Sequence, residues 1–470
     1  MERIGRHRWD GVGGSAAALL AGALLRGVFL YWHPRYAGDA LTYGDLAHNM
    51  LAHHIFGFSD SVIHPTLIRL PGYPAFLALC FILFGAGNYL SVLWMQAGID
   101  LLSCFLLGKL AGRLMGRRAG FAVLWLAALC PFTANYAAAA LTETLSIFCV
   151  VLAFFALERW TTLQCERNRA LKWAAVVGLA LAFAVLLRPD QGLVSAAIVP
   201  AMLWTSFCAP RCSSDPLRNR WISSGLVVLI VAIPLLLWGA RNWRDFHVVQ
   251  PLAPRYANDP GEPVLYGFQR WYRSWGVEFK STVDVYWAYD GSTVALKDLP
   301  PRAFDSPAQR IQTAAILARY NEEQASTPWV DAAFTQLAAQ RAAQHPLRQY
   351  VVMPMAREAD MWLRPRTELM RQPLDWWNVR AHPGASAFEI AYGMFNLAYL
   401  LMAAVGLWRW SRVRWQPQPA IAAAMLAFVA LRCLLLLTLD NSEPRYTLEC
   451  YPLVILLAGC ALGRQHEFSD

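Results

Sequence analysis

The chain has 470 residues, of which 57% are hydrophobic and only 16% are charged, and its formal net charge is +9. Since soluble domains average about 25% charged residues, this composition excludes an ordinary soluble protein. The positive charge does not indicate nucleic-acid binding, because the basic residues gather where apolar stretches end.

Apolar stretches recur along the chain, and several reach the roughly 20 residues that a membrane-spanning helix needs. They cover residues 11–32, 88–110, 118–132, 136–157, 171–187, 190–207, 222–240, 385–408, 419–439 and 450–463. Helices are the structure that satisfies its own backbone within lipid at this hydropathy. We therefore predict an all-α polytopic membrane protein, a bundle of about nine to eleven transmembrane helices with an external loop domain.

The topology follows from the basic residues at the helix ends. They form four clusters, which are Lys109/Arg113/Arg117/Arg118, Arg159/Arg167/Arg169/Lys172, Arg211/Arg218/Arg220 and Arg409/Arg412/Arg414. The positive-inside rule places these clusters and the basic N-terminus in the cytoplasm. The external segments are then 33–70, 132–137, 187–190, 241–384 and 440–449.

Residues 72–86 are the exception in this topology, because a full crossing there would move two basic clusters outside. The segment is about 15 residues long and is bounded by Pro71, Pro74 and Gly85. We predict a short or re-entrant helix packed against protein. Arg26, within the first apolar stretch, must face protein or extend its side chain outward.

Three parts follow along the chain: an N-terminal membrane core (1–245) that includes the external first loop 33–70, an external loop and helical domain (246–384), and C-terminal membrane helices (385–470). The external segment 241–384 contains no cysteine, which excludes a disulfide-stapled domain. Its run Pro346–Met370 is amphipathic. Such a run suits the membrane interface, and a helix packed on its own domain fits the pattern equally well.

Two acids are candidate catalytic residues. Asp39 lies in Gly38-Asp39-Ala40-Leu41-Thr42-Tyr43, just after the first stretch, where a carboxylate could deprotonate a hydroxyl group at the outer membrane face. Its alternative role is to cap the helix at 41–54, and Asp45 is the rival carboxylate. Glu143 begins an apolar helix on the outer side, where an acid is either functional or placed to suit the helix N-terminus.

Four arginines from separated segments are expected on the same outer face. They are Arg69 in Arg69-Leu70-Pro71-Gly72-Tyr73-Pro74, Arg188 in Arg188-Pro189-Asp190, Arg241 in Ala240-Arg241-Asn242-Trp243, and Arg445 in Glu443-Pro444-Arg445-Tyr446. Singly, each is more often an interfacial anchor, and Arg188 can pair with Asp190. Together they favour a shared site for an anion such as a phosphate.

Metal and nucleotide signatures are weak. His48, His53, His54 and His64 with Asp39 and Asp45 could ligate a divalent metal ion, but no zinc-type spacing such as H-E-x-x-H is present. The sequence has no G-x-x-x-x-G-K-[ST] loop for ATP and no D-x-D pair to hold a nucleotide sugar through a metal. An activated donor, if one is used, is not indicated to be a nucleotide.

These motifs resemble the GT-C class of integral-membrane glycosyltransferases, and specifically family 39, which includes relatives of protein O-mannosyltransferases, the lipid A aminoarabinose transferase and lipopolysaccharide galacturonic acid transferases. The resemblance covers residues 15–245 and the closing turn at 440–452. It is carried by Gly38-Asp39-Ala40 with Tyr43, Arg69–Pro74, Leu114-Met115-Gly116-Arg117-Arg118, Leu141-Thr142-Glu143, Arg188-Pro189, Ala240–Trp243 and Glu443–Tyr446.

The resemblance implies a sugar donor on a polyprenyl phosphate and an inverting transfer to a hydroxyl group of a lipid, glycan or protein. Asp39 would be the general base, with Glu143 as the second catalytic acid, and Arg69, Arg188, Arg241 and Arg445 would stabilise the leaving phosphate. Tyr73, Glu443 and Tyr446 complete the substrate-binding set. The implied location is the inner (plasma) membrane, with the N-terminus cytoplasmic and the active site facing the periplasm.

The sequence departs from its relatives at two points. Protein O-mannosyltransferases have an Asp-Glu pair where Asp39-Ala40 stands here, and the lysine of the aminoarabinose transferase is replaced by Arg69 as the nearest basic group. Donor and acceptor therefore do not carry over, and segment 250–384 is expected to set acceptor choice. The alternative function, a lipid-linked sugar flippase or other transporter, would predict charges near the bilayer midplane and two related halves; a catalytically inactive scaffold is the third possibility.

Overall fold

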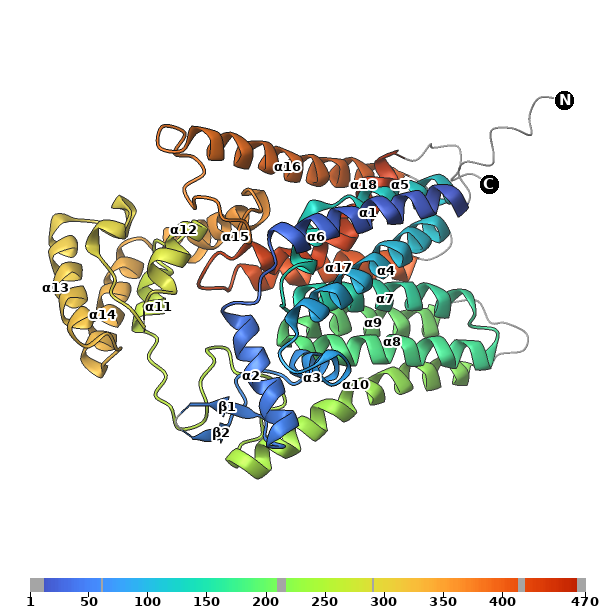
Figure 1. Ribbon diagram of the computed structural model, residues 1–470, viewed down its shortest axis with the longest axis horizontal. Coiled ribbons are helices and arrows are strands. Elements are labelled where there is room, and N and C mark those ends of the chain that lie inside the picture. The colour runs from blue at the N-terminus through green and yellow to red at the C-terminus, as the bar shows by residue number, and fades with distance from the viewer. Residues whose placement is uncertain (1–11, 61, 209–216, 290, 413–418, 463–470) are drawn as a thin grey trace. The chain divides into compact units, whose positions relative to one another are not determined.

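The computed structural model describes residues 12–60, 62–208, 217–289, 291–412 and 419–462 (Figure 1). The basic residues of the N-terminus and Arg211 and Arg414, which support the predicted topology, lie outside this part. The described chain is almost entirely helical, as predicted. Its one sheet is a small antiparallel hairpin of β1 (Gly57–Ser59) and β2 (Ile63–Pro65).

Eight helices of the described residues are long and apolar enough to cross a membrane. They are α1 (Val12–Trp32), α4 (Tyr89–Met115), α7 (Glu143–Thr162), α8 (Arg167–Leu187), α10 (Leu217–Phe246), α16 (Pro383–Arg412), α17 (Pro419–Leu436) and the continuous helix formed by η6 (Pro444–Cys450) and α18 (Tyr451–Leu462). A ninth span results if α5 (Arg117–Ala128) and α6 (Pro131–Ala137), bent by 51°, count as one. Pro131 marks that break, because proline suits the first turn of a new helix.

Two shorter apolar helices complete the membrane set. α3 (Gly72–Phe84) has 13 residues, about 20 Å of helix, which is less than the roughly 30 Å of a bilayer core. It is thus the short helix that the flanking prolines and glycine predict. α9 (Gly192–Cys208) has 17 residues and contains Pro200.

The chain divides into two compact units. The first comprises residues 1–261, 398–429 and 448–470, and the second comprises 262–397 and 430–447. The second unit thus begins at residue 262 rather than at the predicted 246, and it also takes in the first half of α16 and the end of α17.

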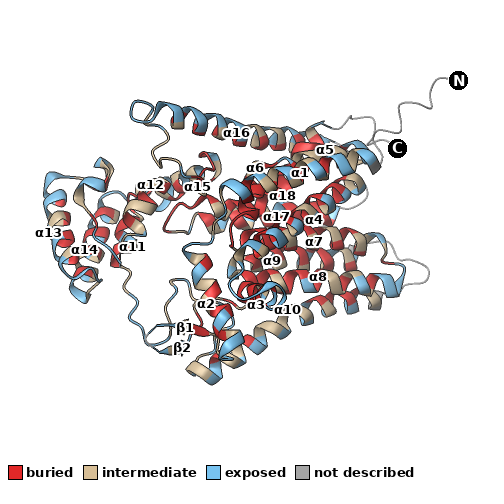
Figure 2. Ribbon diagram, in the orientation of Figure 1, coloured by how far each residue is buried: buried red, intermediate tan, exposed pale blue. Residues whose placement is uncertain are grey.

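In the first unit, α8 packs against α7 and α10, and α4 packs against α5 and α7 (Figure 1). Glycines set the closest of these contacts: a Cβ on Gly120 would lie 2.6 Å from the Cα atom of Gly112. Small residues of this kind let membrane helices approach each other closely. The red ribbon of Figure 2 shows buried residues along the facing sides of these helices.

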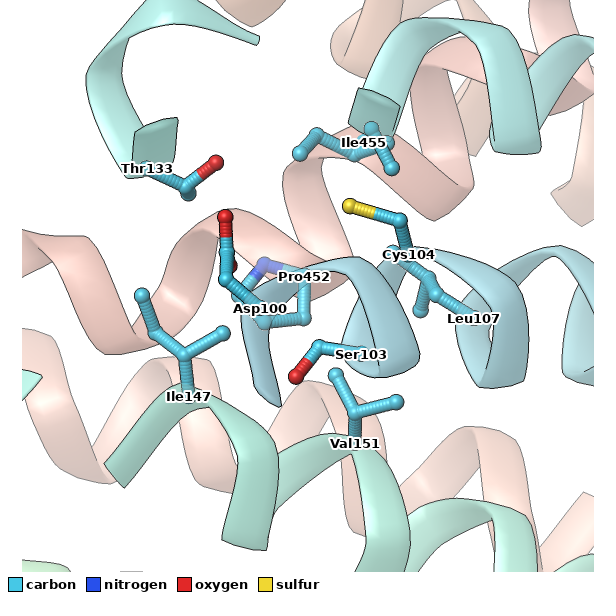
Figure 3. A pocket seen from close by; sticks show the side chains of 10 residues that line it. Asp100, Ser103, Cys104, Leu107, Thr133, Ile147, Val151, Pro452 and Ile455 are labelled. Carbon is cyan, nitrogen blue, oxygen red and sulfur yellow. The ribbon is translucent and has the colours of Figure 1, made fainter. Parts of the chain in front are cut away.

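A buried ion pair joins α1 to α4. Arg26 donates from Nε to Oδ2 of Asp100 at 2.8 Å and from Nη1 to the carbonyl oxygen of Ala128 at 2.8 Å, and both charged side chains are buried. Arg26 therefore faces protein rather than extending outward. Asp100, Ser103 and Thr133 line a small cavity beside the pair, together with apolar groups such as Ile147 (Figure 3).

The second unit has its own core, which is rich in aromatic residues. Phe268 and Trp271 of α11 (Gly267–Tyr272) pack with Phe334 of α14 (Pro328–Gln344), and Tyr320 of α13 (Pro307–Glu323) belongs to the same cluster. Both long helices begin at a proline after a capping hydroxyl, Ser306 or Thr327. α12 (Phe279–Ser281) and α15 (Met353–Leu363) complete the unit's α-helices outside α16 and α17.

Candidate functional site

Asp39 lies in the first turn of α2 (Asp39–Ala52), directly after the first membrane helix and its exit segment. Gly38 holds the N-cap position with a φ of 61°, a value that glycine adopts without strain. The structure thus differs from the alternative prediction that Asp39 caps the helix. A carboxylate in the first turn is still favoured by the positive end of the helix.

Arg69 lies beside Asp39. Its Nη2 atom is 3.3 Å from Oδ1 of Asp39, and the two side chains are 28% and 32% exposed. Its guanidinium also lies over the ring of Tyr43, 6.0 Å from the ring centre. The remaining contacts are sparse: Nη1 donates to the carbonyl of Ile68 at 3.4 Å, and the buried Nε has no hydrogen-bond partner among the described residues. Arg69 therefore keeps donor capacity next to a partly exposed carboxylate.

Tyr43 connects this pair to a second cluster. Burial raises the pKa of its hydroxyl group, the nearby charge of Arg69 opposes that rise, and Asp39 adds to it; Arg188 and Glu143 act on the same hydroxyl group. Asp39, Arg69, Arg188 and Glu143, which are far apart in the sequence, therefore all lie within electrostatic range of one phenol. The structure brings together four of the predicted site residues.

Tyr73 packs against Tyr43. The two rings meet edge to face with centres 5.1 Å apart, and the buried Tyr73 hydroxyl donates to Oε1 of Gln96 at 2.7 Å. Gly72 allows this placement, because a Cβ there would lie 2.6 Å from the backbone of Leu186 in α8. Tyr73 is thus fully buried and packs against Tyr43.

Arg188, at the end of α8, is surrounded by carboxylates. Its Nη1 donates to Oε1 of Glu143 at 2.9 Å, and its Nε and Nη2 donate to the two oxygens of Asp190 at 3.1 and 3.2 Å. Oε1 of Glu449 lies 3.5 Å from Nε. The predicted pairing with Asp190 is confirmed. One guanidinium therefore faces three carboxylates, so its positive charge is already compensated.

Glu449 is the functional candidate that the sequence analysis missed. It lies in η6, is fully buried, and reaches the same guanidinium as the fully buried Glu143. The usable signal was an acid inside an apolar helical segment, since such residues rarely lack a function or a partner.

Two predicted or rival residues have structural partners. Arg241 donates to the carbonyl oxygens of Thr66 and Phe56 at 2.7 and 2.8 Å, and its Nε pairs with Asp245 at 2.8 Å. It thereby fastens α10 to the segments flanking the β hairpin. Asp45 accepts the backbone N–H of Ser59 at 2.8 Å, so it holds β1 against α2.

The other predicted site residues, Glu443, Arg445 and Tyr446, belong to the second unit. Nε of Arg445 pairs with Oε1 of Glu443 at 2.5 Å, and the Arg445 guanidinium lies 5.8 Å from the ring centre of Tyr446. Arg366 donates to the carbonyl oxygen of Pro444 at 3.1 Å and fixes the turn. The motif therefore forms one local cluster.

The predicted histidine site has no metal-binding geometry in the described part of the chain, where no three His, Cys, Asp or Glu side chains gather suitably. His64 instead lies 3.7 Å from Asp60, and the rings of His48 and His53 are 6.2 Å apart. A metal requirement stays an untested prediction.

Comparison with known proteins gives matches of two kinds. Residues 64–238 match the family described as dolichyl-phosphate-mannose-protein mannosyltransferase. No curated protein matches the chain. Similar solved structures include the Archaeoglobus fulgidus oligosaccharyltransferase tethered with an acceptor peptide, at 12% identity and a TM-score of 0.51, and the same enzyme in complex with an inhibitory peptide and a dolichol-phosphate, at 15% identity and a TM-score of 0.51.

The similarity to the oligosaccharyltransferase covers 97% of this chain and 50% of that one, so the chain spans half the length of the archaeal enzyme. ArnT from Cupriavidus metallidurans bound to undecaprenyl phosphate matches with 14% identity and a TM-score of 0.41, over 97% of this chain and 78% of ArnT. Identities this low concern the fold. The chain is therefore a multi-pass membrane protein with the GT-C fold that its sequence predicts, and residues 64–238 carry the pattern of the mannosyltransferase family.

Proposed function

We propose that the protein is an inverting glycosyltransferase that moves a sugar from a polyprenyl-phosphate donor to a hydroxyl group of a lipid, glycan or protein acceptor. The observation that carries this proposal is the Asp39–Arg69 pair, a partly exposed carboxylate beside an arginine with spare donors. A transfer of this kind needs a base for the acceptor and a cation for the departing phosphate. The match of residues 64–238 to a family named for a lipid-phosphate-sugar donor supports it.

Asp39 is the proposed general base, because its carboxylate is partly exposed beside Arg69. Asp45 binds the β hairpin, and Glu143 is fully buried against Arg188. In the reaction, the oxygen of the acceptor hydroxyl group forms a bond to the anomeric carbon of the sugar. Asp39 takes the proton that this hydroxyl group loses. The bond from that carbon to the phosphate oxygen breaks on the opposite face, so the configuration inverts and polyprenyl phosphate leaves as an anion.

Arg69 is the proposed ligand of that phosphate. Its partly exposed guanidinium makes only long contacts of 3.3 and 3.4 Å through Nη2 and Nη1, which leaves donors for a phosphate oxygen, and charge-assisted bonds of this kind are strong in a partly dry site. We assign Arg188 and Glu143 to positioning, because they form a largely buried ion pair and Arg188 is paired with Asp190 and Glu449 as well. Arg241 holds the hairpin segment in this proposal.

Glu443, Arg445 and Tyr446 of the second unit remain proposed substrate-binding residues, as the resemblance implies. We place the protein in the inner (plasma) membrane with its N-terminus cytoplasmic and the site on the periplasmic face. The oligosaccharyltransferase structure with a dolichol-phosphate shows that a protein of this fold holds a lipid phosphate, which supports a lipid-linked donor here.

The test is sugar transfer by purified protein in nanodiscs, given a panel of radiolabelled polyprenyl-phosphate sugars and a membrane-lipid extract. Wild type is compared with Asp39→Asn, which keeps the shape of the side chain and removes the base. Asp45→Asn is the matched control on the same helix. We expect Asp39→Asn to lose at least about 100-fold in transfer rate while donor binding persists; undiminished transfer by that variant would exclude Asp39 as the base.

A flippase is the second candidate, since the Arg26–Asp100 pair is a charge within the spans of the kind that a transporter uses. Both side chains of the pair are buried, and the guanidinium also binds the carbonyl oxygens of Gly22 and Ala128, so the pair is held within the protein. No transfer with any donor, together with movement of lipid-linked sugar between leaflets, would establish the flippase instead.

A further inference from the structure

The helix α15 in the second unit buries charged side chains against its own unit and exposes a row of apolar side chains. Arg357 is 1% exposed, and its Nη1 donates to the carbonyl oxygens of Arg273 and Gly276 at 2.9 and 3.1 Å. Asp360 faces inward too, with a side chain 15% exposed and 4.0 Å from Arg364. A helix on a water-exposed surface has the opposite arrangement.

The exposed side of the same helix is a continuous apolar stripe. It consists of Val352, Met355, Ala359 and Leu363, and the turn before it adds Leu347, Tyr350 and Val351. Met355 is 60% exposed and Leu363 is 55% exposed. The stripe residues recur every three or four positions, so they form one face. We call this set the α15 stripe.

The end of α15 contacts a membrane helix of its own unit. Asn396, halfway along α16, donates to the carbonyl oxygen of Trp362 at 2.8 Å. Asn396 lies 13 residues into α16, about 20 Å from the helix start, so this contact is well below the end of a span.

The α16 segment in the second unit also exposes apolar side chains. Phe388, Met394 and Phe395 are all exposed, and α16 meets the length and hydropathy of a membrane span. Residues of this kind on a span face acyl chains. Since Asn396 binds the backbone of Trp362, the end of α15 lies beside a helix whose exposed apolar side chains suit acyl chains.

We propose that α15 is embedded in the membrane and that acyl chains cover the α15 stripe. The helix therefore fixes the second unit to the bilayer while its charged side turns away from lipid. Under this proposal, both sequence-based interpretations of Pro346–Met370 apply, each to one face of the helix. The charged face packs on its own unit, and the apolar face lies in lipid. The inference requires that α16 spans the membrane and does not depend on catalytic activity.

The test places the photocrosslinking residue p-benzoyl-phenylalanine at single positions of the full chain in phospholipid nanodiscs. Met355 and Leu363 report on the α15 stripe, and Leu236, 69% exposed on the span α10, is the positive control. Ile311, 73% exposed on α13, is the matched negative control in the same unit. Gel filtration selects folded, monodisperse protein before irradiation, and mass spectrometry detects the phospholipid adduct.

We expect Met355 and Leu363 to give a phospholipid adduct at a yield within about threefold of Leu236, and Ile311 to give at most a tenth of that yield. Adducts at Leu236 but not at either stripe position would overturn the proposal. Crosslinks from Met355 to a second copy of the chain would overturn it as well, because they would show that a protein interface covers the stripe.

Discussion

At the scale of single residues, three arginines of similar sequence context have different partners. Arg69 has long contacts and a buried nitrogen without a partner among the described residues, whereas Arg188 is surrounded by Glu143, Asp190 and Glu449. Arg241 binds backbone carbonyl oxygens. A guanidinium that is already paired has little left to offer an anion, so the neighbours decide which arginine can bind phosphate.

Replacing Arg188 with alanine tests the carboxylate cluster. We expect Arg188→Ala to lower the free energy of unfolding by about 3–5 kcal/mol, because it leaves buried Glu143 and Glu449 without their positive partner. Thermal unfolding in detergent, followed by tryptophan fluorescence, measures this. Arg244, whose side chain is 79% exposed and which also pairs with an aspartate, is the control; an equal shift for Arg244→Ala would contradict the explanation.

At the scale of elements, close packing places the site. α3 can bring Tyr73 under Tyr43 because Gly72 lies against the backbone of α8, and α10 holds the hairpin segment through Arg241. The contacts of Gly72 with Leu186 and of Arg241 with Thr66 join segments that are more than a hundred residues apart in the chain. The geometry of Asp39 and Arg69 therefore depends on helices that contribute no catalytic side chain.

Gly72→Ala tests the approach of α3 to α8. The added Cβ would lie 2.6 Å from the backbone carbonyl of Leu186, so we expect a loss of about 1–3 kcal/mol in stability together with reduced transfer activity. Gly98→Ala in α4 is the control, since a Cβ there meets nothing within 4 Å. Measured unfolding midpoints that fall equally for both variants would refute a packing cause.

Asp305 links elements within the second unit. It accepts from Arg348 at 2.7 and 2.8 Å and lies 3.3 Å from Arg341 of α14. Burial alone would raise the pKa of this carboxyl, but the hydrogen bonds from Arg348 and the charge of Arg341 outweigh burial and lower it.

The lowered pKa predicts a pH dependence. Since the folded-state pKa of Asp305 lies below its unfolded value of about 3.9, its stabilising contribution is complete above that value and is lost as the pH falls through the folded pKa. We expect Asp305→Asn to lower the unfolding midpoint clearly at pH 7 and progressively less toward pH 3. A difference between wild type and variant that stays constant over this range would contradict the assignment.

At the scale of the whole molecule, the directions of α8 and α10 show whether α9 crosses the membrane. The C-terminal end of α8 carries Arg188 near Tyr43, and the C-terminal end of α10 carries Arg241 against Thr66, so both ends lie at the site. α8 and α10 are packed together and therefore run the same way. α9, between them in the chain, must return across the membrane even though its 17 residues fall below the length of the eight clear spans.

Reporter fusions test this crossing. With the N-terminus in the cytoplasm, we expect alkaline phosphatase fused after residue 214 to be inactive and the same enzyme fused after residue 250 to be active. Green fluorescent protein at the two positions should give the reverse result. Phosphatase activity at residue 214 would show that α9 does not cross.

The fold class and the positions of the membrane helices are encoded locally, because a stretch of about 20 apolar residues has few alternatives in lipid. The sequence by itself therefore determined the helical bundle, the short helix at 72–84 and the motifs of the first loop. It could not determine which carboxylate is partly exposed beside an arginine, or which arginine has spare donors. Those properties depend on partners distant in the chain, such as Glu449 beside Arg188, and only tertiary packing brings these charges into contact.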